Sequence, residues 1–264
     1  MIAVENLSVV FNAGTPLERR ALRGVSLTLD NGEFVCVIGS NGAGKSTLLG
    51  AIAGDVSAAS GRILVAGQDV TRQPAEARAQ HVARVFQDPL AGSCGNLSIA
   101  ENLALAAGRG SRRRFGNALR RERAEMLYTR IKELALGLED RLDQPMGSLS
   151  GGQRQALSLV MATLAPSSVL LLDEHTAALD PRNADFVLDL TRTLAARFGL
   201  TVLMVTHSMR QALDLGTRTI MLHEGQILLD VSGEHRSKLT VEDLIDAFRK
   251  ARGEELAEDR LLTS

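Results

Sequence analysis

The eight residues G-S-N-G-A-G-K-S at positions 39–46 constrain the fold of this chain more than any other segment. They match the spacing G-x-x-x-x-G-K-S/T of a loop whose backbone N–H groups surround the phosphates of a nucleotide. Such a loop needs a buried strand before it and a helix after it, and both are present, as an apolar run at 34–38 and a helical pattern at 47–53. The sequence therefore predicts an α/β nucleotide-binding core.

The residue types within this loop suit a phosphate. Its glycines allow N–H groups to turn inward, and the N-terminus of the following helix adds partial positive charge. Lys45 is one of only four lysines among 30 basic residues, and a compact ammonium fits a tight anion site better than a guanidinium does. Ser46 can offer its hydroxyl to Mg²⁺. The alternative is a glycine-rich turn with a chance lysine. The positions expected to bind nucleotide are Gly39, Ser40, Asn41, Gly42, Ala43, Gly44, Lys45, Ser46 and Thr47.

A second motif lies at residues 169–174, V-L-L-L-D-E, where an apolar strand ends in two carboxylates. Parallel α/β sheets bind their ligands at the carboxyl ends of the strands. We expect Asp173 to hold Mg²⁺ beside Ser46, and Glu174 to orient and deprotonate the attacking water. An Asp-Glu pair alone would be a solvated turn, so these roles depend on the phosphate-binding loop.

Composition excludes several classes of protein. The 30 Lys and Arg balance 31 Asp and Glu, without the basic excess of a nucleic-acid binder. The apolar runs are far shorter than the roughly 20 residues of a membrane helix. The two cysteines, 36 and 94, form no cluster with histidine, which argues against a disulfide or zinc framework. The first residues lack a basic segment followed by an apolar run, so no signal peptide is expected.

The order of elements can be outlined from hydrophobic patterns. Short β-branched runs predict strands within 2–11 and 25–38, a hairpin at 63–69 and a strand at 82–86. Residues 98–164 carry Ala, Leu, Arg and Glu at helical spacing, which predicts a helical insertion. Buried strands at 169–173 and 201–205 flank an amphipathic helix near 181–197, the order of a parallel sheet with crossover helices.

Residues 149–155, L-S-G-G-Q-R-Q, carry a third motif, and together the three resemble the ATP-binding cassette (ABC) transporter ATPases over essentially the whole chain. In that family the signature loop reaches across a head-to-tail dimer to the γ-phosphate held by the partner. Ser150, Gly151, Gly152 and Gln153 correspond to this loop. A hydroxyl and free N–H groups at a helix N-terminus suit an anion, although S-G-G alone also fits an ordinary helix cap.

The resemblance assigns further roles, residue by residue. Gln87, in V-F-Q-D-P, matches the Q-loop glutamine that senses Mg²⁺ and water. Asp180 matches the D-loop aspartate at the dimer seam, and His207 the switch histidine that contacts the γ-phosphate. Phe11 matches the aromatic that stacks on adenine, although such a residue is often part of a core. The implied catalytic residues are Glu174, His207 and Gln87, and the implied metal-binding residues are Ser46, Gln87 and Asp173.

The family resemblance also implies a fold and a division of the chain. The fold is an α/β P-loop NTPase core of the RecA type, with an antiparallel β subdomain and an inserted α-helical subdomain. Residues 1–88 and 165–239 would form the nucleotide-binding core with its β subdomain, and residues 89–164 the helical signature subdomain. Residues 240–264 would form a helical tail, since T-V-E-D at its start resembles a helix cap.

The chain departs from the family at His175, where Asp-Glu is usually followed by proline. This ring could tune the site or contact a partner subunit, and we favour a neutral structural role. The string around it, with V-F-Q-D-P-L-A-G, resembles a branch of bacterial ATP-binding subunits grouped with importers of the tryptophan and tyrosine type.

Seven arginines between Arg109 and Arg123 are expected to form a solvated helix face, with permease loops or anionic lipid as alternative contacts.

The function that the resemblance implies is ATP hydrolysis that powers solute transport, with import favoured. ATP and Mg²⁺ would be the cofactors, and two copies of the chain would bind two ATP molecules at their interface. Separate membrane permease subunits would hold the ATPase at the cytoplasmic face of the plasma membrane, with a solute-binding protein in the intact system and no nucleic acid. The alternative is an ABC-type ATPase or regulator that is not coupled to transport.

Overall fold

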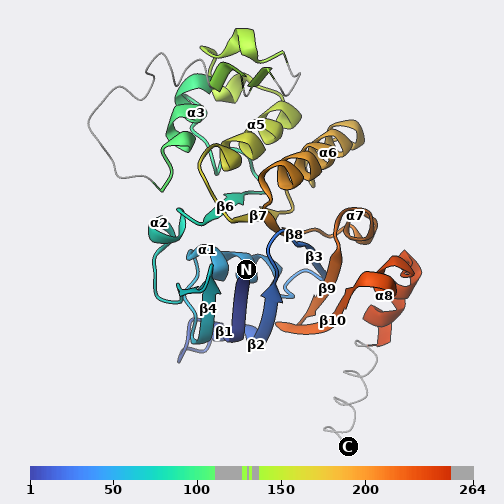
Figure 1. Cartoon of the computed structure of the whole chain (residues 1–264). Helices are drawn as coiled ribbons and strands as arrows, with labels where there is room; N and C mark the ends of the chain where they lie inside the picture. The colour runs from blue at the N-terminus through green and yellow to red at the C-terminus, as the bar shows by residue number, and fades with distance from the viewer. Residues whose placement is uncertain (111–126, 130, 133–136, 251–264) are drawn as a thin grey trace, which may run out of the picture.

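The computed structural model describes residues 1–110, 127–129, 131–132 and 137–250. A six-stranded sheet runs through the centre of the protein (Figure 1). Its neighbouring strands are parallel, except that β10 is antiparallel to β9. The strands predicted at 169–173 and 201–205 are present with these bounds. In spatial order the sheet contains β10 (Gln226–Ser232), β9 (Arg218–His223), β3 (Phe34–Gly39), β8 (Thr201–Val205), β7 (Val169–Asp173) and β6 (Val82–Val85).

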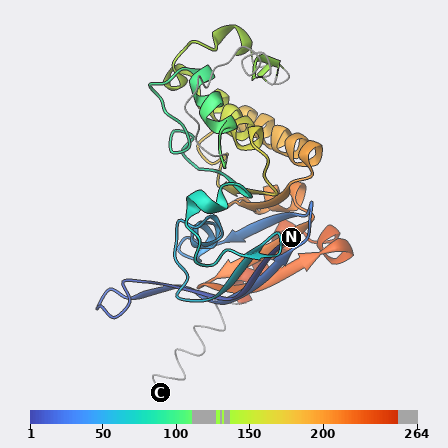
Figure 2. The ribbon, with the colours of Figure 1, turned by 60° about the vertical axis from the view of Figure 1, so that its left-hand side comes forward.

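An antiparallel sheet of four strands packs beside it, in the order β2 (Arg19–Leu29), β1 (Ile2–Phe11), β4 (Ser60–Val65) and β5 (Gln68–Asp69). The strand β2 begins before the predicted position 25. Arg19 and Arg20 extend it by pairing with Phe11 and Val10 of β1. Both arginines are exposed, so this part of the strand lacks the alternation of apolar and polar residues by which a strand is predicted from sequence. The turn between β1 and β2 projects beyond the sheet (Figure 2).

The helices connect and cover these sheets. They are α1 (Lys45–Ala53), α2 (Ala75–Arg78), α3 (Ile99–Ala107), α5 (Gly151–Leu164), α6 (Pro181–Phe198), α7 (Met209–Leu215) and α8 (Gly233–Ser237), with short 3₁₀ turns at Glu139–Arg141 and Met146–Ser148. Helices α3, α5 and α6 lie together at one end of the molecule, away from the antiparallel sheet (Figures 1 and 2). No helix within the described ranges is long and apolar enough to cross a membrane.

A further helix begins after Thr240, as the T-V-E-D pattern predicts. The Thr240 Oγ1 accepts a hydrogen bond from the Asp243 backbone N–H at 3.2 Å, and the Asp243 carboxylate accepts from the Thr240 N–H at 2.8 Å. This reciprocal pair satisfies two N–H groups at the start of the helix.

The central sheet has an apolar core on each face, because side chains along a strand point alternately to opposite faces. Phe34, Cys36 and Ile38 of β3 pack in the cluster that includes α5 and α6. Val35 and Val37 pack in the cluster that includes α1 and the antiparallel sheet. The strands of such a doubly covered sheet read as continuous apolar runs, which explains why the sequence revealed them.

Candidate functional site

Four neighbouring strands end at the same edge of the central sheet, and each is followed by predicted site residues. The phosphate-binding loop follows β3, His207 follows β8, the pair Asp173 and Glu174 ends β7, and Gln87 follows β6. Because β3, β8, β7 and β6 are adjacent and parallel, residues far apart in the sequence meet at one place.

The end of the phosphate-binding loop packs closely against the backbone of β2. Gly44, directly before α1, has φ +101°, and a Cβ there would lie 2.6 Å from the carbonyl oxygen of Ala21. Glycine is therefore required on both conformational and steric grounds. The Lys45 Nζ donates to the carbonyl oxygens of Gly39 and Ser40 at 2.9 and 3.0 Å. Burial lowers the pKa of Lys45, and the nearby carboxylates of Glu174 and Asp173 counteract this effect.

Ser46 and Asp173 are in direct contact, as their predicted roles require. The Ser46 Oγ donates to Asp173 Oδ1 at 3.0 Å, and the Asp173 side chain is largely buried. A hydroxyl and a carboxylate are hard oxygen donors of the kind Mg²⁺ prefers, so these residues fit that ion. The third predicted metal-binding residue, Gln87, is exposed and makes no hydrogen bond to either of them among the described residues.

Glu174 and His207 also come together. The Glu174 Oε2 lies 3.7 Å from the His207 Nδ1. Glu174 has φ +44°, a left-handed conformation that costs a non-glycine residue roughly 1 kcal/mol or more. Two hydrogen bonds hold this backbone conformation. The Glu174 N–H donates to the Val205 carbonyl, and the Glu174 carbonyl accepts from the Ala177 N–H, both at 3.0 Å. A strained backbone at this position is consistent with a functional side chain.

His175, the residue after Glu174, is buried against α6. Its ring is only 3% exposed, and its Nε2 lies 3.1 Å from the Thr191 Oγ1 of α6. Since the Thr191 hydroxyl donates to the Val187 carbonyl at 2.7 Å, its oxygen accepts from His175. Burial lowers the pKa of His175 to about 4. The predicted neutral structural role is confirmed.

The signature residues begin helix α5. The Ser150 Oγ accepts from the Gln153 N–H, and the Gln153 Oε1 accepts from the Ser150 N–H, both at 3.2 Å. A Cβ on Gly152 would lie 2.6 Å from the Asn183 Oδ1, so α5 packs closely against the start of α6. Asp180 begins α6 and accepts from the Asn183 amide and backbone N–H, which lowers the Asp180 pKa. Ser150, Gly151 and Asp180 remain exposed.

Phe11 lies at the end of β1, in the antiparallel sheet rather than at the edge of the central one. Its side chain is 38% exposed, which leaves a ring face available for stacking. The structure therefore places Phe11 and the signature residues on elements other than the four strand ends. Among the described residues, no hydrogen bond or ion pair joins Phe11, Ser150, Gly151, Gly152 or Gln153 to those ends.

Sequence reasoning missed Arg84 of β6, whose guanidinium donates to the Asp173 Oδ2 at 2.8 Å. The available signal was a cation inside the apolar run V-A-R-V-F, which asks for a buried anionic partner.

A family model for ABC transporters matches residues 22–177, which include the phosphate-binding loop, the signature residues and the carboxylate pair. The chain belongs to the ABC transporter ATPase family. As a member, it binds and hydrolyses ATP, and its α/β core with an antiparallel sheet and added helices is the fold that its motifs predicted.

Curated ABC relatives match most of the chain. It is 41% identical to a tyrosine transport ATP-binding protein of Clostridioides difficile strain R20291, over 95% of this chain and 100% of that protein. It is 34% identical to an energy-coupling factor transporter ATP-binding protein of Clostridium tetani, over 87% and 78%. It is 35% identical to a thiamine import ATP-binding protein of Escherichia coli O157:H7, over 76% and 82%.

Solved ABC structures have the same fold. A dimeric ATP-binding cassette in a post-hydrolysis state, bound to ADP and Pi, is 26% identical with a TM-score of 0.74, over 88% of this chain and 98% of that one. Another ATP-binding cassette of an ABC transporter is 25% identical with a TM-score of 0.78, over 94% and 98%.

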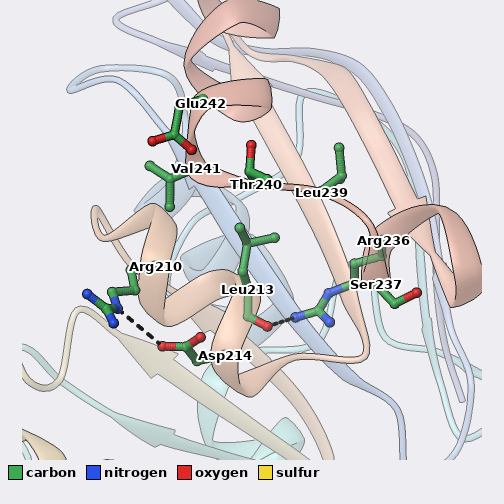
Figure 3. Close-up of a pocket in the computed structure, with 9 residues that line it drawn as sticks. All are labelled: Arg210, Leu213, Asp214, Arg236, Ser237, Leu239, Thr240, Val241 and Glu242. Atoms are coloured by element: carbon green, nitrogen blue, oxygen red, sulfur yellow. Dashed lines mark hydrogen bonds and ion pairs between the residues drawn. The ribbon is translucent and has the colours of Figure 1, made fainter.

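A pocket of about 400 Å³ lies elsewhere on this ABC protein, between α7 and the start of the C-terminal helix (Figure 3). Its guanidinium groups already have partners. The Arg236 Nη2 donates to the Ala212 and Leu213 carbonyls at 2.7 Å, and Arg210 lies 3.8 Å from Asp214. None of the predicted site residues lines this pocket, so it is separate from the nucleotide site.

The arginine-rich segment is only partly described. Arg109 is half-buried, and its Nη2 donates to the Ala162 and Ala165 carbonyls at the end of α5, at 2.8 and 3.4 Å. Its predicted place on a solvated face is therefore wrong. Arg109 instead stabilises the C-terminus of α5. The other six arginines, from 112 to 123, lie outside the described residues.

Proposed function

We propose that this chain is the ATP-binding subunit of an importer, and that it powers uptake of a small solute through separate membrane permease subunits. The observation that carries the proposal is the pairing of Ser46 with Asp173 and of Glu174 with His207 at one sheet edge. This arrangement provides a place for a nucleotide phosphate and, beside it, a carboxylate that can take a proton from water.

The residues of this site have different roles in ATP hydrolysis. Lys45 binds the β- and γ-phosphates, and Ser46 and Asp173 hold Mg²⁺, which supplies positive charge against the phosphate oxygens when bound. Glu174 accepts the proton of the attacking water. His207, 3.7 Å away, keeps the Glu174 carboxylate oriented and contacts the γ-phosphate. Gln87 approaches the metal and water when nucleotide binds, and Phe11 stacks on the adenine.

The catalytic unit is a head-to-tail dimer of two copies. Ser150, Gly151 and Gly152 of one copy, with Gln153 beside them, meet the γ-phosphate bound by the other, and Asp180 lies at their seam; of these residues Ser150, Gly151 and Asp180 are exposed. The dimeric cassette bound to ADP and Pi supports this assembly. Residues 1–88 and 165–239 form the nucleotide-binding core with its β subdomain, and residues 89–164 form the helical subdomain that contacts the permease. Residues 240–264 form the tail, of which 251–264 lie outside the described residues.

The relatives favour an amino acid as cargo. The match to a tyrosine transport ATP-binding protein extends over the full length of that relative, which supports an aromatic amino acid. The name of the thiamine import relative supports the inward direction. We place the chain at the cytoplasmic face of the plasma membrane, held there by its permease, with a solute-binding protein delivering the cargo.

Phosphate release by Glu174→Gln tests the catalytic assignment. This change keeps the shape of the side chain and removes its basicity, so we expect turnover to fall by roughly 10²- to 10⁴-fold while ATP binding is retained. Glu224→Gln is a matched control because Glu224 is also a glutamate in a left-handed conformation, at φ +43°, but in the turn between β9 and β10. Comparable rates in wild type and Glu174→Gln would contradict the assignment.

Uptake in vesicles tests the coupling. We expect the chain to copurify with membrane subunits, and the reconstituted complex to take up labelled tyrosine with ATP but not with Glu174→Gln. If the chain releases phosphate but no membrane subunit copurifies with it, an ATPase or regulator that is not coupled to transport is favoured instead.

A further inference from the structure

Arg84 is a cation within the short strand β6, at the edge of the central sheet and paired with β7. Its guanidinium joins two carboxylates. The Nη2 donates to Asp173 Oδ2 at 2.8 Å, and the Nη1 donates to Asp55 Oδ2 at 2.6 Å. The Arg84 side chain is only 16% exposed, so solvent screens these charge-assisted bonds less than it does at the surface.

The two oxygens of Asp173 therefore have different partners. Oδ2 accepts from Arg84, and Oδ1 accepts from the Ser46 Oγ at 3.0 Å. A carboxylate held at both oxygens cannot rotate about its terminal bond without losing one of these contacts. Arg84 thus fixes Oδ1 on the side of the phosphate-binding loop.

Arg84 is itself held by several elements. Its guanidinium carbon lies 4.7 Å from the ring centroid of Phe86, within cation–π range. The Phe86 carbonyl accepts from the Gln155 Nε2 of α5 at 3.2 Å, and Asp55 follows α1. Within the described residues the buried Arg84 Nε has no hydrogen-bond partner, so the two Nη groups determine where the guanidinium lies.

We propose that Arg84 is a positioning residue that orients Asp173 for Mg²⁺. This inference rests on the proposed function, which assigns the metal to Ser46 and Asp173. The planar fork of arginine reaches Asp173 and Asp55 at once, whereas the single ammonium of lysine cannot bridge them in the same geometry. Residues that orient a metal-binding group typically change metal affinity by about 10- to 100-fold when they are replaced.

The test is the Mg²⁺ dependence of nucleotide binding to the purified full chain, measured with a fluorescent ADP analogue in Mg²⁺ and in EDTA. ADP avoids turnover, so the measurement does not depend on activity. For Arg84→Met we expect the Kd in EDTA to stay within about twofold of wild type and the tightening produced by Mg²⁺ to fall by about tenfold. Arg84→Lys should recover only part of this effect.

Arg62→Met is the matched control, because Arg62 also joins two carboxylates from a strand, with Asp69 at 3.3 Å and Glu5 at 3.7 Å, but in the antiparallel sheet. It should leave the Mg²⁺ effect unchanged. Weaker binding of Arg84→Met in both Mg²⁺ and EDTA, together with a lower melting temperature, would mean that Arg84 is only structural and would overturn the proposal.

Asp173→Asn separates this proposal from the proposed function. If Asp173→Asn loses the Mg²⁺ effect and Arg84→Met keeps it, the positioning role of Arg84 is wrong and the metal assignment stands. If Asp173→Asn keeps the Mg²⁺ effect, the metal assignment itself is wrong.

Discussion

His175 should make the stability of this protein depend on pH in a way that its surroundings allow us to calculate. The ring is 3% exposed and neutral, and its Nε2–H donates to the Thr191 hydroxyl oxygen. Burial lowers the pKa from 6.5 in the unfolded chain to about 4 in the folded protein. Between these two values the unfolded chain binds a proton that the folded protein excludes, so stability is lost as the pH falls below 6.5.

The magnitude follows from the two pKa values. At pH 7 the effect on the free energy of unfolding is small. At pH 5 protonation of His175 in the unfolded chain lowers the free energy of unfolding by about 2 kcal/mol. The full shift corresponds to about 3 kcal/mol, reached only below the folded pKa of about 4. His175→Gln keeps an N–H donor near the Nε2 position but does not titrate, so it should lose less stability than wild type on acidification.

Urea unfolding at pH 7 and pH 5 measures this difference, and circular dichroism is the suitable signal because the chain has no tryptophan. We expect the gap in unfolding free energy between wild type and His175→Gln to change by about 2 kcal/mol between the two pH values. Other titrating groups are common to both proteins and cancel in this comparison. His235→Gln, at an exposed position, is the control and should follow wild type. An unchanged gap would refute a neutral, desolvated His175.

Two further predictions concern stability, and both are measured by urea unfolding. Gly61→Ala should destabilise the protein by about 2 kcal/mol more than Gly67→Ala. Both positions have positive φ, but only at Gly61 would a Cβ lie within 2.6 Å of two carbonyl oxygens, those of Asn6 and Glu5. Equal losses of stability would contradict this steric explanation. Arg78→Met should lower the free energy of unfolding by about 3 kcal/mol, because the buried Arg78 guanidinium donates to four backbone carbonyls, those of Ala51, Ile52, Thr71 and Gln73. Arg72 is exposed, so the stability of Arg72→Met should stay within about 0.5 kcal/mol of wild type.

Much of the fold and several site residues could be predicted because their signals are local. The loop at 39–46 needs glycine where φ is positive and where backbone approaches closely, as at Gly44, so its function is written into consecutive residues. The strands β7 and β8 are buried on both faces and read as continuous apolar runs. The start of β2 was misplaced because Arg19 and Arg20 belong to an exposed ladder.

Side-chain partners could not be predicted in the same way, because they depend on which strands and helices become neighbours. Arg109 belongs to a run of arginines in the sequence, yet it bonds to carbonyls at the end of α5. Arg84 pairs with Asp173 only because β6 lies beside β7. The choice among the three roles considered for His175 depends on α6, whose Thr191 lies 3.1 Å from the ring nitrogen.

The sequence by itself determined that this chain has a phosphate-binding loop, a carboxylate pair after a buried strand and a capped signature helix, because each is specified by a few consecutive residues. Only the tertiary structure decided that Ser46 meets Asp173, that His207 meets Glu174 and that Arg84 holds the second oxygen of Asp173. The physical reason is that these contacts arise from the spatial order of β3, β8, β7 and β6, which differs from their order along the chain.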